Sequence, residues 1–137
     1  MSQTRSIPSA APARPLLWWA LAGDAAASGA CGLLMALAAD PLSGLLGLPV
    51  TLLRYAGLAL LPYALFLAWL ARRPVPPRGL VWAVIAANVL WAADCILVLA
   101  AGAFTPTGLG VAFVLVQAVT ALAFAELQLI GLRRAGR

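Results

Sequence analysis

The chain has 137 residues, of which 64% are hydrophobic and only 9% are charged. A typical soluble domain is about a quarter charged, and a soluble fold of this length could not bury so much apolar surface. Nine arginines, four acidic residues and no lysine or histidine leave a formal net charge of +5. This composition excludes an ordinary soluble enzyme or binding domain and predicts a protein embedded in a membrane.

Four long apolar stretches follow a first segment of 14 residues that is rich in Ser, Ala and Pro and is expected to be a disordered cytoplasmic tail. Each stretch can cross about 30 Å of hydrocarbon, which takes roughly 20 helical residues at 1.5 Å per residue. Prolines and glycines mark the short breaks, so consecutive spans should be antiparallel neighbours. The predicted fold is all-α, a four-transmembrane-helix up-down-up-down bundle in one domain of residues 15–137, with helices over residues 16–39, 50–71, 80–101 and 108–132.

The first stretch has features of a cleaved signal sequence, because the segment from Ala36 to Ala38 resembles a signal-peptidase site and Cys31 resembles a lipoprotein cysteine. However, the apolar run is longer than the roughly 7 to 15 residues of a signal sequence and contains Asp24. Ser28 also stands where a lipoprotein signal usually has an aliphatic residue. We therefore expect this stretch to remain as a membrane span.

The arginines indicate the orientation of the spans. Cytoplasmic segments next to spans are enriched in Lys and Arg, and all but one of the arginines lie before the first stretch, between the second and third, or after the fourth. Both termini are therefore expected in the cytoplasm. Arginine without lysine, with abundant Ala, Gly and Pro, is typical of a GC-rich bacterial genome, which predicts the inner membrane. The expected partner of the positive charge is the lipid bilayer rather than a nucleic acid.

Polar side chains within the spans are the candidates for function, because an ionisable group near the bilayer centre costs about 2.5 to 3.5 kcal/mol. Counting roughly 1.5 Å per residue places Asp24, Asn88 and Tyr63 at one depth, about 12 to 14 Å from the cytoplasmic face. Gln117 falls somewhat further out. These four residues form a predicted polar layer.

Two charged residues lie nearer the outer face. Arg54 and Asp94 both fall about 6 to 10 Å below the outer surface at that rise per residue, so an intramembrane ion pair between them is predicted. Glu126 lies near the cytoplasmic face, where its side chain can extend toward water.

Helical spacing groups several polar residues into stripes that should face the bundle interior. The stripes are Asp24, Ser28 and Cys31, then Asn88, Trp91 and Cys95, and finally Gln117, Thr120 and Gln128. Hydrogen bonds that only fix helix packing explain such stripes as well as a solvated pocket does.

A shift of 64 residues superposes parts of the two halves of the chain. It pairs Trp18 with Trp82, Asp24 with Asn88, and Cys31 with Cys95. This match suggests a two-plus-two internal repeat, with the two cysteines at equal depth. Cys31 and Cys95 are therefore a candidate thiol pair, although inert buried thiols are the simpler interpretation.

Chemistry is limited by what the chain lacks. There is no histidine, no CxxC pair, no phosphate-binding glycine loop and no nucleophile elbow, so we expect no catalytic residue, no cofactor and no metal site. The leading hypothesis is a non-enzymatic protein with a structural, accessory or regulatory role, acting as a homodimer or with a membrane-protein partner. Small residues in the first span are suited to close helix contacts in either case.

Two alternatives stay open. One is a small-solute or proton-coupled transporter in which Asp24 is the ionisable group, Asn88 and Gln117 orient the solute, and the Arg54 and Asp94 pair gates the outer side. The other is a membrane thiol redox protein that uses the two cysteines. A sealed bundle would favour packing, whereas a cavity open to one side would favour transport.

Overall fold

The computed structural model describes residues 14–136, and in this part of the chain every regular element is a helix. The elements are α1 (Leu16–Leu37), α2 (Ala39–Leu46), α3 (Val50–Ala71), α4 (Arg78–Ala100) and α5 (Gly108–Ala135). The four longer helices are long and apolar enough to cross a membrane. The all-α, four-span prediction is therefore confirmed, whereas the predicted tail lies outside the described residues, apart from Arg14.

The short helix α2 is the element that the sequence did not predict. The segment after α1 was expected to be a loop because it holds Pro41 and glycines. Pro41 instead lies in the first turn of α2, where a proline removes no helical hydrogen bond, and Asp40 next to it is favourable at a helix N-terminus. Gly47, with φ of 68°, ends the helix in the left-handed conformation.

Two of the long helices extend beyond their predicted ends. Helix α4 begins at Arg78, directly after Pro77, rather than at residue 80. Helix α5 continues to Ala135, with Arg133 and Arg134 in its last turn, where positive charge interacts favourably with the helix dipole. The three additional residues change the depth of every side chain counted from that end.

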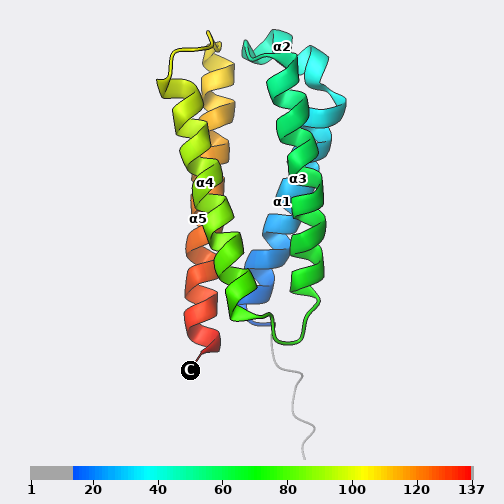
Figure 1. Ribbon diagram of the computed structural model, residues 1–137, viewed down its shortest axis with the longest axis vertical. Helices are drawn as coiled ribbons and strands as arrows, with labels where there is room; N and C mark the ends of the chain where they lie inside the picture. Colours follow the sequence, from blue (N-terminus) through cyan, green and yellow to red (C-terminus); the bar gives the residue numbers. More distant parts are fainter. Residues whose placement is uncertain (1–13, 137) are drawn as a thin grey trace, which may run out of the picture.

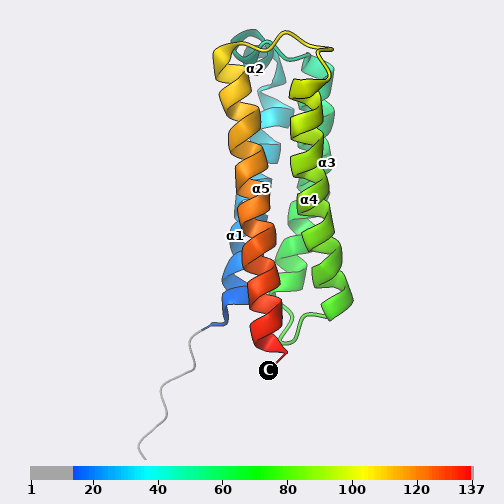
Figure 2. The same cartoon turned by 90° about the vertical axis from the view of Figure 1, so that its left-hand side faces the viewer.

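The helices form two pairs, in which α1 packs on α3 and α4 packs on α5. The pairs meet mainly through α1 and α5, and successive long helices run in opposite directions along the long axis (Figures 1 and 2). Helix α2 lies across the end of the bundle that is remote from the C-terminus (Figure 1). We call this end the α2 end and the opposite one the terminal end.

Glycines allow the closest contacts between the helices. A Cβ atom on Gly57 of α3 would lie 2.6 Å from the backbone nitrogen of Ala36 in α1, and one on Gly32 would lie 3.0 Å from the Gly57 carbonyl oxygen. At the terminal end, a Cβ on Gly131 of α5 would lie 2.8 Å from the backbone of Leu17. The small residues of α1 therefore serve packing within the chain.

Two apolar clusters fill the ends of the bundle. The cluster at the terminal end is built on leucines and valines of α1, α3, α4 and α5, including Leu21, Leu67, Leu70, Val81 and Leu132. The cluster at the α2 end includes Met35, Leu46, Leu53, Ala92 and Val114. The polar side chains of α1, α4 and α5 meet between these two clusters.

The contact between α2 and α5 generates a prediction. A Cβ on Gly110 would overlap the carbonyl oxygen of Leu46, a backbone atom that no side-chain rotation can move away. Gly110→Ala should therefore lower the free energy of unfolding by about 3 kcal/mol, the upper range for overpacked sites. Denaturant titration in detergent micelles would measure it. Gly108→Ala is the matched control, because nothing lies within 4 Å of that position; equal stability of the two variants would contradict the close contact.

Candidate functional site

A buried polar cluster lies at the base of the site. Asp24 of α1, Asn88 of α4 and Gln128 of α5 are only 2%, 4% and 0% exposed. Asn88 Nδ2 donates to Asp24 Oδ2 at 2.7 Å and to Gln128 Oε1 at 3.0 Å, and Gln128 Nε2 donates to the same Asp24 oxygen at 2.7 Å. The three side chains thus close a hydrogen-bonded triangle between three helices, which we call the polar triad.

Asp24 only accepts hydrogen bonds in this arrangement. Its second oxygen, Oδ1, accepts from the Ser28 hydroxyl at 3.0 Å, one helical turn further along α1. In the described part of the chain the sole salt bridge joins Arg54 to Asp40, so the partners of Asp24 are uncharged. The site therefore holds a buried acid without a cationic partner.

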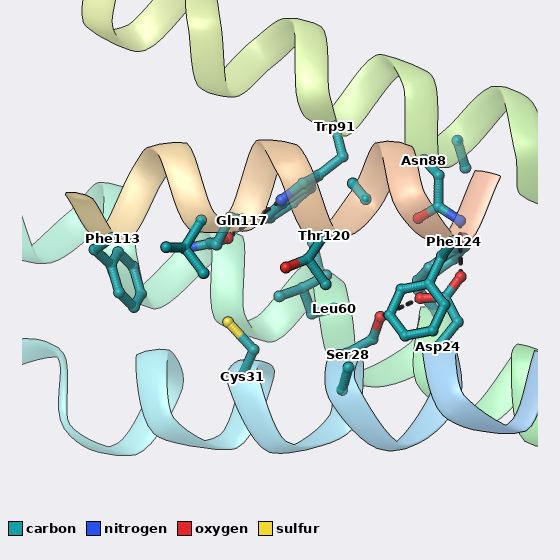
Figure 3. A pocket seen from close by; sticks show the side chains of 16 residues that line it. Asp24, Ser28, Cys31, Leu60, Asn88, Trp91, Phe113, Gln117, Thr120 and Phe124 are labelled. Atoms are coloured by element: carbon teal, nitrogen blue, oxygen red, sulfur yellow. Dashed lines mark hydrogen bonds between the residues drawn. The ribbon is translucent and has the colours of Figure 1, made fainter. Parts of the chain in front are cut away.

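A cavity of about 450 Å³ lies directly on the α2 side of the triad. Figure 3 shows Asp24 and Asn88 at one end of it and Gln117 and Phe113 toward the other, with Cys31 and Thr120 between them. We call it the central cavity. Its walls are mostly apolar and contain aromatic side chains from three helices, namely Tyr63, Trp91, Phe113 and Phe124.

The central cavity is not sealed. Its lining includes Ala59 of α3 and Val116 and Thr120 of α5, which are exposed on the surface of the bundle. Within residues 14–136 every buried side-chain nitrogen and oxygen has a hydrogen-bond partner. Asn88 lines the cavity, and its Oδ1 accepts no hydrogen bond and is not fully buried. This oxygen is a free acceptor beside the carboxylate.

A second polar group closes the far end of the cavity. The Trp91 indole nitrogen donates to Gln117 Oε1 at 3.2 Å, which links α4 to α5. Gln117 Nε2 points to the sulfur of Met35 on α1 at 3.9 Å, and the Cys31 thiol donates to the same sulfur at 3.5 Å. These side chains form a wall across the bundle, one end of which depends on a weak sulfur acceptor.

A second cavity of about 310 Å³ lies beyond this wall, toward the α2 end. It is lined by residues of α1, α3, α4 and α5, and the charged group among them is Asp94. Trp91, Phe113 and Gln117 line both cavities. We call this space the Asp94 cavity.

The four residues of the predicted polar layer line the same space. Asp24 and Asn88 are in direct contact. Tyr63 lines the same cavity, and its hydroxyl donates to the Val84 carbonyl at 3.4 Å. Gln117 lies at the opposite end of the cavity, further from the terminal end of the bundle.

Gln128 was not predicted as part of the site, although it shares a stripe with Gln117. A helix ending at residue 132 puts Gln128 only about 6 Å from the terminal end of the bundle, too shallow to reach Asp24. Because α5 continues to Ala135, the distance rises to roughly 10 Å, close to the depth of Asp24. The basic residues at the end of α5 were the signal for this extension.

The predicted ion pair between Arg54 and Asp94 is wrong. Arg54 Nη2 lies 2.9 Å from Asp40 Oδ2, and the two side chains are 44% and 75% exposed. Asp40 comes within reach because α2 folds across the end of the bundle next to the start of α3. Equal depth does not imply contact, since α3 packs on α1 and α2 whereas α4 packs on α5.

The two cysteines are free thiols. Cys31 lines the central cavity, whereas the buried Cys95 lines the Asp94 cavity. Asp24 and Asn88, which the 64-residue shift aligns, are in direct hydrogen-bond contact; the internal repeat itself stays a prediction. In residues 14–136 no group of three His, Cys, Asp or Glu side chains comes together to hold a metal ion.

No protein-family model, curated protein sequence or solved structure matches this chain significantly. The fold and the site define a four-span helical membrane protein with an acid-containing cavity between its helices. Any statement about its activity rests on the geometry of that cavity.

The polar triad predicts a specific loss of stability. Asp24→Asn keeps the size of the side chain but replaces one of its two acceptor oxygens with an NH2 group, so this position can no longer accept from Asn88 and Gln128, or from Ser28 on the other side. We expect a loss of about 1 to 3 kcal/mol in the free energy of unfolding in micelles. Glu126→Gln removes an exposed acid in the same bundle and should change it by less than roughly 0.5 kcal/mol. Similar effects of both substitutions would argue against the triad.

Proposed function

We propose that the protein binds a small amphiphilic solute with one positive charge and carries it across the membrane, with Asp24 as the ionisable group. The observation that supports this is the central cavity of about 450 Å³ bounded by a buried, uncompensated carboxylate. Cavities of roughly 300 to 1,000 Å³ with apolar walls and a few polar groups are typical of small-molecule sites.

Charge and shape together favour a cationic solute. A carboxylate in a low-dielectric site attracts a cation far more strongly than it would in water. Aromatic faces such as that of Trp91 add a cation–π attraction, and the free Asn88 oxygen offers an acceptor for an N–H group. The apolar walls match an uncharged body on the same molecule.

A proton and the solute would compete for Asp24. One carboxylate takes up one positive charge, and the other partners of Asp24 are neutral, so protonation and cation binding exclude each other. This competition is the simplest way to couple solute movement to a proton gradient, and it needs no further ionisable residue.

A structural or accessory role is the second candidate. The observation that favours it is that the triad joins α1, α4 and α5 with all its buried polar atoms satisfied. Such a cluster would specify the packing of the bundle even without a ligand. In this second candidate function the cavity binds no solute, and the protein supports a membrane-protein partner.

The protein is proposed to lie in a bacterial inner membrane with both termini in the cytoplasm. Six of the exposed arginines gather at the terminal end of the bundle, and two of these, Arg14 and Arg73, lie over the rings of Trp18 and Trp69 at 4.0 and 4.4 Å. A basic end with tryptophans is typical of a cytoplasmic membrane interface. The α2 end would then face outward.

Binding can be tested with a pair of probes of nearly equal shape. Benzyltrimethylammonium should bind to the purified protein in nanodiscs, whereas its neutral isostere neopentylbenzene should bind at least about tenfold more weakly, because only the cation interacts with Asp24. Isothermal titration calorimetry would measure both. Glu126→Gln should leave the affinities unchanged, since this exposed acid lies outside the cavity lining.

Two variants separate loss of charge from loss of space. Asp24→Asn should abolish the preference for the cation, and Ala27→Leu, which fills the central cavity while leaving the triad intact, should weaken both probes. Cation binding that is equal in Asp24→Asn and in the wild type would refute the transport proposal. If neither probe binds while Asp24→Asn still lowers stability, the structural role stands.

Orientation is tested by reporter fusions in a bacterial host. A green fluorescent protein fused after residue 136 should fluoresce, because that protein folds in the cytoplasm, whereas alkaline phosphatase at the same place should be inactive. Fusions after Gly47, beyond the α2 helix, should show the opposite pattern. Active phosphatase at the C-terminus would reverse the proposed orientation.

A further inference from the structure

We propose that the Asp94 cavity is a second binding site for cations and that the side chains of Trp91 and Gln117 separate it from the central cavity. The identity of the solute rests on the proposed function, but the connection between the cavities does not. The two spaces lie in series along α4, and their shared wall would have to move for a solute to pass.

The order of residues along α4 places the wall between the two acids. Asn88, Trp91 and Cys95 follow one face at spacings of three and four residues, and Asp94 precedes Cys95. Asn88 holds Asp24 at the base of the central cavity, and Trp91 lies in both linings. A solute moving along this face would therefore meet Asp94, then the wall, then Asp24.

Asp94 gives the second cavity its chemistry. Its side chain is exposed and makes no hydrogen bond or ion pair with any residue in 14–136, and Arg54 pairs with Asp40 instead. An ionisable residue at membrane depth is costly and typically marks an ion or solute path. The remaining lining is mostly apolar, so the cavity suits a cation with an apolar body.

The wall is held by weak interactions. One neutral hydrogen bond of 3.2 Å joins Trp91 to Gln117, and a 3.9 Å contact joins the Gln117 amide to the Met35 sulfur. Thioether sulfur is a poor acceptor, so rotation of the Gln117 side chain loses only a weak interaction with Met35. Trp91 is only partly buried, which leaves its ring space to move with the amide.

The two native cysteines report on the two cavities separately. Cys95→Ala leaves Cys31 as the single thiol, in the central cavity, and Cys31→Ala leaves Cys95, in the Asp94 cavity. The probes are the cationic trimethylammonium-ethyl and the anionic sulfonato-ethyl methanethiosulfonates. Reaction rates are measured by mass spectrometry in micelles, and N-ethylmaleimide, which is uncharged, checks that each thiol is intact.

In the single-cysteine protein that keeps Cys95, the cationic reagent should react faster than the anionic one. Asp94→Asn should lower the ratio of the two rates about tenfold, because the acid concentrates cations in the cavity. Glu126→Gln should leave the ratio unchanged. A ratio that does not depend on Asp94, or no reaction with either charged reagent, would overturn the second site.

In the protein that keeps Cys31, both charged reagents should react slowly while the wall is intact, because the exposed side of the central cavity lies within the candidate spans α3 and α5, where detergent covers it. Gln117→Ala should raise the rate with the cationic reagent roughly tenfold, the equivalent of losing about one hydrogen bond. Trp91→Phe, which keeps an aromatic ring but loses the N–H donor, should give a smaller rise and serves if Gln117→Ala fails to fold. Val119→Ala is the control, because Val119 lies on the surface of α5 and is 66% exposed.

The wall is refuted if Cys31 reacts equally fast in the wild type, Gln117→Ala and Trp91→Phe. These measurements need no transported solute, so they separate this proposal from the proposed function. Open cavities in a protein that binds neither benzyltrimethylammonium nor its isostere would leave the connection standing and remove the cationic carrier.

Discussion

The hydrogen bonds to the Asp24 carboxylate constrain the rest of the structure. An acid at this depth finds no water in the hydrocarbon, so the protein must supply every partner. The donors come from Ser28 on the same helix, Asn88 on α4 and Gln128 on α5. Satisfying a single side chain thereby sets the relative depth and rotation of three of the four spans, and it places the base of the central cavity.

Close packing at the two ends leaves space in the middle. At the terminal end Gly131 lets α5 touch the backbone of α1, and at the α2 end Gly110 lets α5 touch the end of α2. Between these contacts the side chains of the two helix pairs do not fill the interior, and the central cavity remains. The apolar clusters at both ends supply the packing that this open middle lacks.

For the candidate site, the sequence could supply the depth of each residue along its helix. Asp24, Asn88 and Tyr63 share a layer because their distances from the helix ends are similar, and Gln117 is further out for the same reason. Gln128 and Asp40 were missed because each depended on an element boundary: the late end of α5 and the unexpected helix α2. Helix boundaries depend on capping residues and on tertiary contacts, which the local composition of the sequence predicts only weakly.

Sequence by itself determined the four spans and the depth of the polar groups, because hydrophobic length and a constant rise per residue are local properties. It also determined which end of the bundle is basic. Only the tertiary structure decided which helices are neighbours, and therefore that Arg54 pairs with Asp40, that Asp94 lines a cavity instead, and that Asp24 is surrounded by neutral donors. Rotation about each helix axis is set by packing between helices, which depth along a single helix does not encode.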